Sequence, residues 1–165
     1  MNAEQMMEDF KKEALDHLGR MRDVMRETEK HEFMQSVMII PAKKMEGGKI
    51  GHLVMLPGIE MQEVPGAIQH LVEKFGGARI FFLVEAWIKK VRKEEFTGQD
   101  FKDIEAEKVE VICVHGSDRL LGDICACQHM DRDEKGVPTF KSEPEILTSG
   151  RTSLSQGLWG SETLN

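Results

Sequence analysis

The amino-acid sequence predicts an α+β fold: a mostly antiparallel sheet of about five to six strands with two helices packed on it, in the order α-β-β-α-β-β-β. Apolar residues recur at steps of three and four in two segments, which is the helical period. Elsewhere they form short strand-like runs, and short links between successive runs favour antiparallel pairing. The 165 residues are near the usual size of one domain.

The first predicted helix spans residues 3–29. Its apolar side chains fall on one stripe, while charged residues occupy the other faces. Such a stripe is buried either against the domain's own sheet or against the same helix of a second copy, and the sequence leaves both open. The stripe consists of Met7, Phe10, Ala14, Leu18, Met21 and Met25.

A hairpin is predicted next, from residues 33–41 and 50–56. The two glycines between these segments, Gly47 and Gly48, supply the positive φ angles that a tight turn requires. A turn centred on them places Ile39 opposite Leu56, so that apolar residues face one another across the pair.

A second helix is expected to end at Phe75, because the glycine pair that follows suits a helix C-terminus. The strongest strand covers residues 78–91. Its first half is apolar on both faces, which is typical of a central strand that is covered from both sides. The two helices are the available covers.

The C-terminal half contains shorter segments. Beyond residue 144 the composition shifts to Ser, Thr and Gly, so we expect residues 1–144 to form the domain and residues 145–165 a flexible tail. Between the central strand and the tail we expect a long loop (92–107), two strands (108–115 and 120–130) joined by a turn at residues 116–118, a turn (131–136) and a short strand (137–140).

The composition favours an acidic, well-solvated protein of the cytoplasm. The formal net charge of −7 repels phosphate backbones, so no nucleic-acid partner is expected. No apolar run reaches the roughly 18 residues of a membrane span, and the N-terminus lacks the basic and apolar regions of a signal peptide. Three cysteines without framework spacing indicate reduced thiols in a reducing compartment.

One predicted strand carries Cys125, Cys127 and His129 at alternate positions, hence on one face. Thiolates and imidazole are ligands that zinc prefers. However, residues two apart on a strand lie roughly 6.5–7 Å apart, whereas two sulfurs on one zinc are at most about 4.6 Å apart. We therefore expect buried structural thiols and no cofactor; if a metal is bound, these three residues are its expected ligands. Whether Cys113, on the preceding strand, shares their face depends on a register that the sequence does not determine.

Glu85 is the first candidate for acid–base chemistry, because it lies in the apolar central strand, where burial would raise its pKa. His52, on another apolar strand, is its candidate partner. The alternatives are structural: Glu85 marks the edge of the covered region or faces an Arg or Lys across the sheet, and His52 is a hydrogen-bonded core residue. We favour these alternatives and expect no catalytic residues.

The chain holds eleven methionines, and those of the first helix are suited to an adaptable apolar surface. We therefore expect a non-catalytic protein-binding or self-associating domain, most concretely a homodimer formed through the first helix. The competing hypothesis is a small enzyme or a metal-binding protein that uses the residues named above. The candidate contact residues are Met7, Phe10, Met21, Met25, Trp87 and Trp159.

Overall fold

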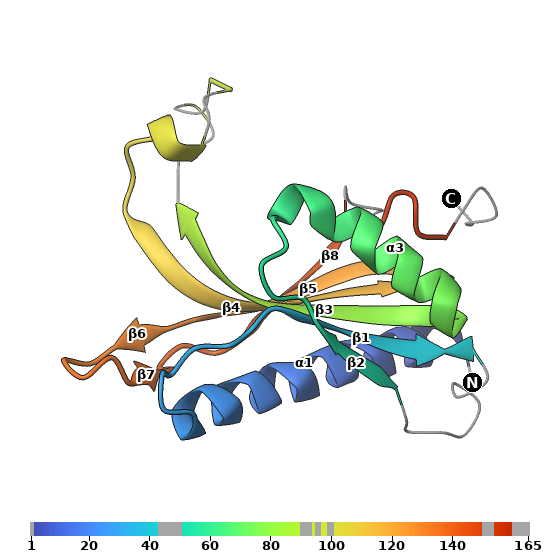
Figure 1. The fold of residues 1–165 in the computed structure, drawn as a ribbon, viewed down its shortest axis with the longest axis horizontal. Helices are drawn as coiled ribbons and strands as arrows, with labels where there is room; N and C mark the ends of the chain where they lie inside the picture. Colours follow the sequence, from blue (N-terminus) through green and yellow to red (C-terminus); the bar gives the residue numbers. More distant parts are fainter. Residues whose placement is uncertain are drawn as a thin grey trace.

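The computed structural model describes residues 2–42, 51–89, 94, 97–98, 101–149 and 154–159, which form an antiparallel six-stranded sheet with a helix on each face (Figure 1). The sheet order is β2-β1-β3-β4-β5-β8, and a two-stranded hairpin, β6-β7, lies outside it. The predicted α+β class and element order are confirmed. The elements are α1 (Ala3–Glu27), β1 (Ser36–Pro41), β2 (His52–Met55), the 3-10 turn η1 (Met61–Glu63), α3 (Val64–Phe75), β3 (Gly77–Lys89), the 3-10 turn η3 (Phe101–Asp103), β4 (Lys108–Asp118), β5 (Gly122–His129), β6 (Asp131–Arg132), β7 (Pro138–Thr139) and β8 (Glu145–Ser149).

Helix α1 covers one face of the sheet. It begins after Asn2, whose side chain accepts a hydrogen bond from the backbone N–H of Gln5 at 2.8 Å, and this satisfies a donor of the first turn. Its apolar stripe packs on β3, β4 and β5, so the domain's own sheet buries this stripe. The first core consists of Phe10, Ala14, Leu18, Met21, Met25, Phe81, Leu83, Ile112, Val114, Ile124, Ala126 and Met130.

Helix α3 covers the opposite face, where it packs on β1 and β3. Gly76 ends this helix in the left-handed conformation, with φ of 63°, as the glycine pair predicted. Strand β3 is central: Phe81 points into the first core and Phe82 into the second, and both are buried. The second core consists of Val37, Ile39, Leu56, Val64, Ile68, Val72, Ile80, Phe82, Leu158 and Trp159.

The register of the first hairpin differs from the prediction. Ile39 pairs with His52, and the predicted partner Leu56 lies beyond the end of β2. Gln35 accounts for the difference, because its backbone carbonyl accepts a hydrogen bond from the Leu56 N–H at 2.9 Å and its side-chain amide donates to the Leu56 carbonyl at 2.7 Å. The glycine pair predicted to form the turn lies outside the described residues.

The predicted turn at residues 116–118 is wrong. These residues belong to β4, and the chain turns at Arg119, Leu120 and Leu121. Gly116 serves packing and not turning: a Cβ atom there would lie 3.0 Å from two ring carbons of Phe10. The glycine that the turn does need is Gly122, with φ of 96°.

The C-terminal segment also differs from the prediction of a flexible tail. Residues Glu145–Ser149 form β8, which pairs with β5 at one end of the sheet. Leu158 and Trp159 are each 9% exposed and belong to the second core. The edge of β5 offers backbone partners to this segment, which composition alone does not reveal. The described part of the fold therefore continues past residue 144.

We predict that His17 makes the fold sensitive to mild acid. Burial against the sheet and, to a smaller extent, the Arg20 charge together lower the pKa of His17 from 6.5 to about 4. The unfolded chain therefore binds the proton first, so stability is full above about pH 6.5 and falls as the pH drops toward 4. Urea denaturation measures this effect as a change in the free energy of unfolding. Between pH 7 and pH 4 that free energy should fall by on the order of 2–3 kcal/mol less in His17→Gln than in the native chain. The exposed His70→Gln is the matched control, and parallel pH curves for the native chain and His17→Gln would contradict the prediction.

Candidate thiol site

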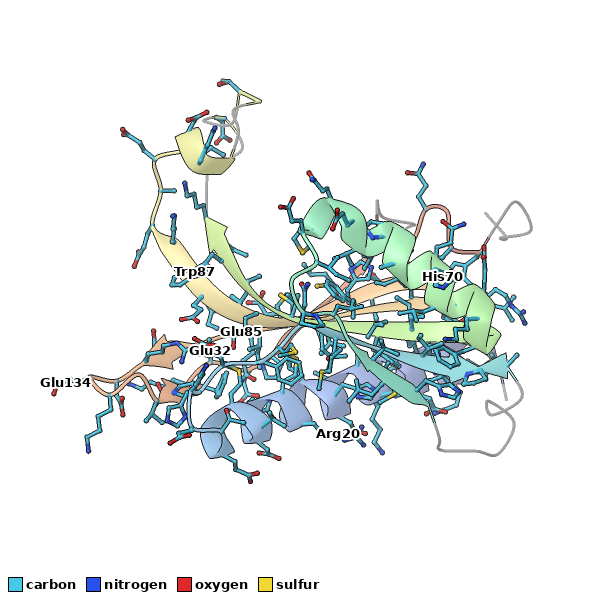
Figure 2. The ribbon with its side chains drawn as sticks, viewed as in Figure 1. Arg20, Glu32, His70, Glu85, Trp87 and Glu134 are labelled. Carbon is cyan, nitrogen blue, oxygen red and sulfur yellow. The ribbon has the colours of Figure 1, made fainter. Side chains whose placement is uncertain are left out.

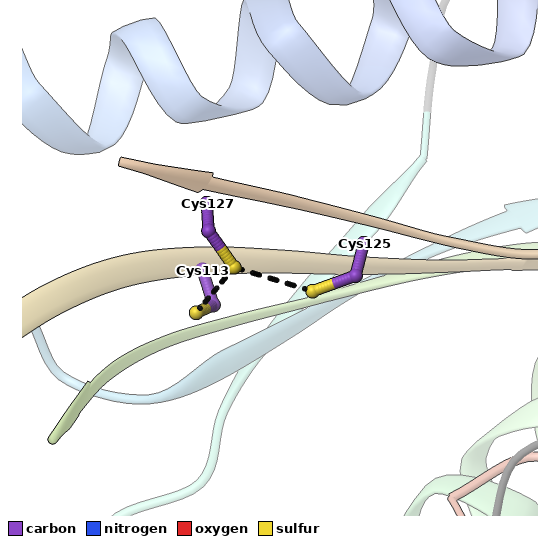
Figure 3. Close-up of side chains that lie close together, drawn as sticks. All are labelled: Cys113, Cys125 and Cys127. Atoms are coloured by element: carbon purple, nitrogen blue, oxygen red, sulfur yellow. Dashed lines mark hydrogen bonds between the residues drawn. The ribbon is translucent and has the colours of Figure 1, made fainter. Parts of the chain in front are cut away.

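The three cysteines of the chain meet on one face of the sheet. The β4–β5 register places Cys113 directly opposite Cys127. The Sγ atoms of this pair lie 3.1 Å apart, and the Sγ atoms of Cys125 and Cys127 lie 3.4 Å apart (Figure 3). All three sulfurs lie within 4.8 Å of one another. The side chains are half-buried, and the structure records all three cysteines as free thiols.

The spacing argument against a shared site at Cys125 and Cys127 was therefore wrong. It used the distance between backbone positions, whereas the two side chains lean toward each other until their sulfurs touch. The third sulfur comes from Cys113 on β4, where the sequence pattern had pointed to His129 on β5. Only the cross-strand register could have revealed Cys113 as the third member.

Hydrogen bonds among the three thiols shift their pKa values in different directions. The pKa of the Cys125 thiol is lowered because Cys113 and Cys127 hydrogen-bond to its sulfur, and the nearby His115 charge acts in the same direction. The pKa of Cys113 is raised because hydrogen bonds to Cys125 and Cys127 and burial all favour its protonated form. The hydrogen bonds among the three sulfurs therefore favour the thiolate form of Cys125 over that of Cys113.

A buried carboxylate network borders the thiols on the same face. Asp123 accepts hydrogen bonds from Ser117 at 2.7 Å and from Ser155, and its Oδ2 lies 3.2 Å from Nε2 of His115. Trp159 Nε1 donates to the Ser117 hydroxyl at 2.9 Å. Although burial opposes ionisation, the hydrogen bonds from His115, Ser155 and Ser117 hold the pKa of Asp123 well below its usual range. The C-terminal segment is thus attached to this carboxylate by side-chain hydrogen bonds.

The site lies on the face of the sheet that carries α3, and different elements cover different parts of that face. Helix α3 packs on β1 and β3 and contributes no core residue over β4 or β5. The segment that contains Ser155 and Trp159 packs beside α3 and reaches β4 and β5. The three cysteines are members of neither core. They are therefore held by strands while remaining partly accessible.

Glu85 and His52 are not brought together. Glu85 pairs with Ile112, whose side chain faces α1, whereas His52 lies on the α3 face and stacks on the Phe75 ring at 4.2 Å. The Glu85 carboxylate accepts a hydrogen bond from the Phe33 N–H. Its Oε2 lies 3.8 Å from Nη2 of Arg132. Burial raises the pKa of Glu85, and the Phe33 N–H and the Arg132 charge oppose that rise.

The candidate contact residues of α1 are mostly inaccessible. Phe10, Met21 and Met25 are fully buried in the first core, and Met7 packs against that core. These side chains cannot meet a partner while the helix is packed as observed. This placement agrees with the alternative in which the domain's own sheet buries the stripe.

The two tryptophans have different surroundings. Trp159 is buried and bonded to Ser117, so it anchors the C-terminal segment. Trp87 is exposed on the part of β3 that curves away from α3, beyond Glu85 (Figure 2). Trp87 is therefore the one candidate contact among the six that presents a large aromatic surface to solvent.

The chain matches no protein-family model, no curated protein and no solved structure. Within the described residues, no helix has the length and hydropathy needed to cross a bilayer. The interpretation of the site therefore depends on the geometry and chemistry of its own residues.

We predict that Glu85 has a structural role through Arg132. This arginine donates to both carboxylate oxygens of Glu110 at 3.0–3.2 Å and also faces Glu85. Arg132→Met should destabilise the fold by about 1–3 kcal/mol at pH 7, because two part-buried carboxylates lose a charged partner. The loss should shrink as the pH falls, because burial raises the pKa of Glu85 and its protonated carboxyl no longer needs a charged partner. Adding Glu85→Gln to Arg132→Met should recover part of the stability in urea denaturation; no effect of Arg132→Met would contradict the assignment.

Proposed function

We propose that this domain binds one soft metal ion, with Zn²⁺ as the expected ion, through the thiolates of Cys113, Cys125 and Cys127. The observation that carries the proposal is that all three cysteines of the chain place their sulfurs within 4.8 Å of one another. Zinc holds thiolate sulfurs at about 2.3 Å, so sulfurs at tetrahedral positions lie roughly 3.8 Å apart. The sulfur separations of 3.1 Å and 3.4 Å are shorter than that value by less than 1 Å.

The setting supports a metal site over simple packing. The three cysteines belong to neither hydrophobic core, so filling a core does not explain their convergence. Two hydrogen-bonded strands hold them, which reduces the conformational entropy that metal binding would cost. The thiols must stay reduced to bind metal, which is compatible with the cytoplasmic location that the cysteine content favours. A non-catalytic, structural role is the form of this function that the sequence and the site support.

We predict stoichiometric metal binding by the reduced chain. Zn²⁺ should bind at one equivalent, and Co²⁺ in its place should produce the near-ultraviolet absorption of thiolate-to-cobalt charge transfer. Each single change of Cys113, Cys125 or Cys127 to Ser should weaken binding by more than the roughly 10–100-fold typical of losing an outer-shell partner. Isothermal titration and cobalt absorption measure both effects.

Two outcomes would contradict metal binding. The first is a reduced native chain that takes up no Zn²⁺ and shows no charge-transfer band with Co²⁺. The second is serine variants that bind as tightly as the native chain. A mass 2 Da below that of the reduced chain after purification, due to a Cys113–Cys127 disulfide that withstands mild reductant, would assign the cluster to redox chemistry instead.

A second candidate function is self-association through β2, and specific side chains favour it. In the sheet formed by the described residues, β2 is an end strand with one paired neighbour, β1. Its Leu53 and Met55 are each 51% exposed and share one face, and Met34, just before β1, is also exposed. An end strand with exposed apolar side chains is suited to pairing with another strand. We propose that the occupant is β2 of a second copy, which would extend the sheet across two chains.

We predict that the native chain dimerises and that charges on β2 abolish the dimer. Sedimentation velocity at roughly 50 µM should show a dimer for the native chain and a monomer for Leu53→Lys/Met55→Lys, because two lysines on an edge strand oppose pairing. Leu120→Lys, at an exposed leucine of the β4–β5 turn, is the matched control and should remain dimeric. A native chain that stays monomeric, or a lysine variant that stays dimeric, would exclude this interface.

A further inference from the structure

Cys113 and Cys127 face each other across β4 and β5, and we infer that hydrogen peroxide converts them into a reversible disulfide that expels the proposed metal ion. This inference rests on the proposed function of the thiol site and adds its regulation. The disulfide and the metal require the same two sulfurs, so the site holds either one or the other. Cys125 remains a free thiol in the oxidised chain.

The backbone hydrogen bonds between β4 and β5 determine which opposite side chains lie closest. The Met130 N–H donates to the Glu110 carbonyl at 2.9 Å, so these two residues form a hydrogen-bonded pair. Hydrogen-bonded and non-hydrogen-bonded pairs alternate along an antiparallel ladder. Cys113 and Cys127 are three positions further along on each strand and therefore form a non-hydrogen-bonded pair. The Cα atoms of such a pair lie about 4.5 Å apart, within the range of about 4.4–6.8 Å that a disulfide spans.

The other two pairings of the cysteines fit a disulfide less well. Cys125 and Cys127 are two apart on one strand, where Cα atoms lie roughly 6.5–7 Å apart, at the upper limit for a disulfide. Their side chains lean until the sulfurs are 3.4 Å apart, but the backbone separation remains. Cys113 and Cys125 are diagonal neighbours, with Cα atoms about 7–8 Å apart. Cys113 and Cys127, whose sulfurs lie 3.1 Å apart, are therefore the pair that a disulfide joins with the least movement.

The oxidation consumes two thiols and one molecule of peroxide. The first sulfur attacks a peroxide oxygen, the O–O bond breaks, and a sulfenic acid and one water form. The second sulfur attacks the sulfenic sulfur and displaces its hydroxyl group as a second water. The two thiol protons end in these waters, and two electrons pass from sulfur to oxygen. A small oxidant can reach the pair, because all three cysteines are only half-buried.

Formation of the disulfide removes two of the three proposed metal ligands. Zinc binds thiolates, and a disulfide sulfur carries no negative charge. The remaining Cys125 supplies a single thiolate, which is too few to hold the ion. The sheet needs no rearrangement, because β4 and β5 already hold the pair at the separation that a disulfide requires. Oxidation therefore changes metal affinity while the fold stays intact.

The experiment adds hydrogen peroxide to the full chain loaded with Zn²⁺ and measures the released zinc with a colorimetric chelator. One Zn²⁺ should be lost for each disulfide formed. Reduction with dithiothreitol, its removal and addition of fresh Zn²⁺ should restore the loaded state, because the disulfide is reversible.

Peptide mapping of the oxidised native chain identifies the pair without any substitution. Trypsin cleaves after Arg119, which puts Cys113 on peptide 109–119 and the other two cysteines on peptide 120–132. Mass spectrometry without reduction should find these two peptides cross-linked. A disulfide within peptide 120–132 would leave them separate.

Two serine variants of the metal-free chain then distinguish the possible partners of Cys113. Cys125→Ser should give the same cross-link as the native chain on addition of peroxide. Cys127→Ser should lose the cross-link, because the remaining two cysteines are diagonal neighbours.

The outcomes separate this inference from the proposed function. A native chain that binds Zn²⁺ but keeps it after peroxide treatment, or that gives separate peptides, overturns the inference and leaves the metal site intact. A cross-link that persists in Cys127→Ser does the same, since it assigns the pairing to Cys125. A reduced chain that takes up no Zn²⁺ instead removes the metal site and its regulation together.

Discussion

The antiparallel register between β4 and β5 is the constraint on which the site and much of the fold depend. It aligns Cys113 with Cys127, His115 with Cys125, and Ser117 with Asp123, so that three successive pairs on one face carry all the chemistry described. A slip of one residue would move every one of these side chains of β5 to the opposite face. The same register brings Gly116 beneath the Phe10 ring, where no larger residue fits without a shift of its neighbours.

Asp118 stabilises that register at its closed end. Its Oδ1 accepts the backbone N–H groups of Leu120 and Leu121 at 2.8 Å and 2.9 Å, which shapes the turn. Its Oδ2 accepts from Nε of Arg79 at 2.8 Å, and Nη1 of Arg79 bonds to Glu13 of α1 at the same distance. One buried carboxylate therefore joins the turn, the central strand and the first helix. The position of α1 and the shape of the β4–β5 turn, which sets the register, are both fixed by this group of charged side chains.

Local pattern was sufficient for the parts of the fold that depend on one segment at a time. The stripe of α1, the two-sided burial of Phe81 and Phe82 and the left-handed Gly76 each follow from periodicity or from one residue's conformational freedom. Local pattern does not predict which residues of two strands pair with each other. The turn was misplaced at Gly116 because the sequence shows a glycine but not the Phe10 ring that requires it. Cys113 could not be assigned to the thiol cluster for the same reason, since its partner Cys127 is defined by the register alone.

The buried carboxylate of Asp123 also links the thiol site to the C-terminal segment. It accepts from His115 beside the thiols and from Ser155 on the segment, and Ser117 connects it to Trp159. The packing of Leu158 and Trp159 into the second core and the arrangement of the side chains beside the thiols therefore depend on the same buried carboxylate.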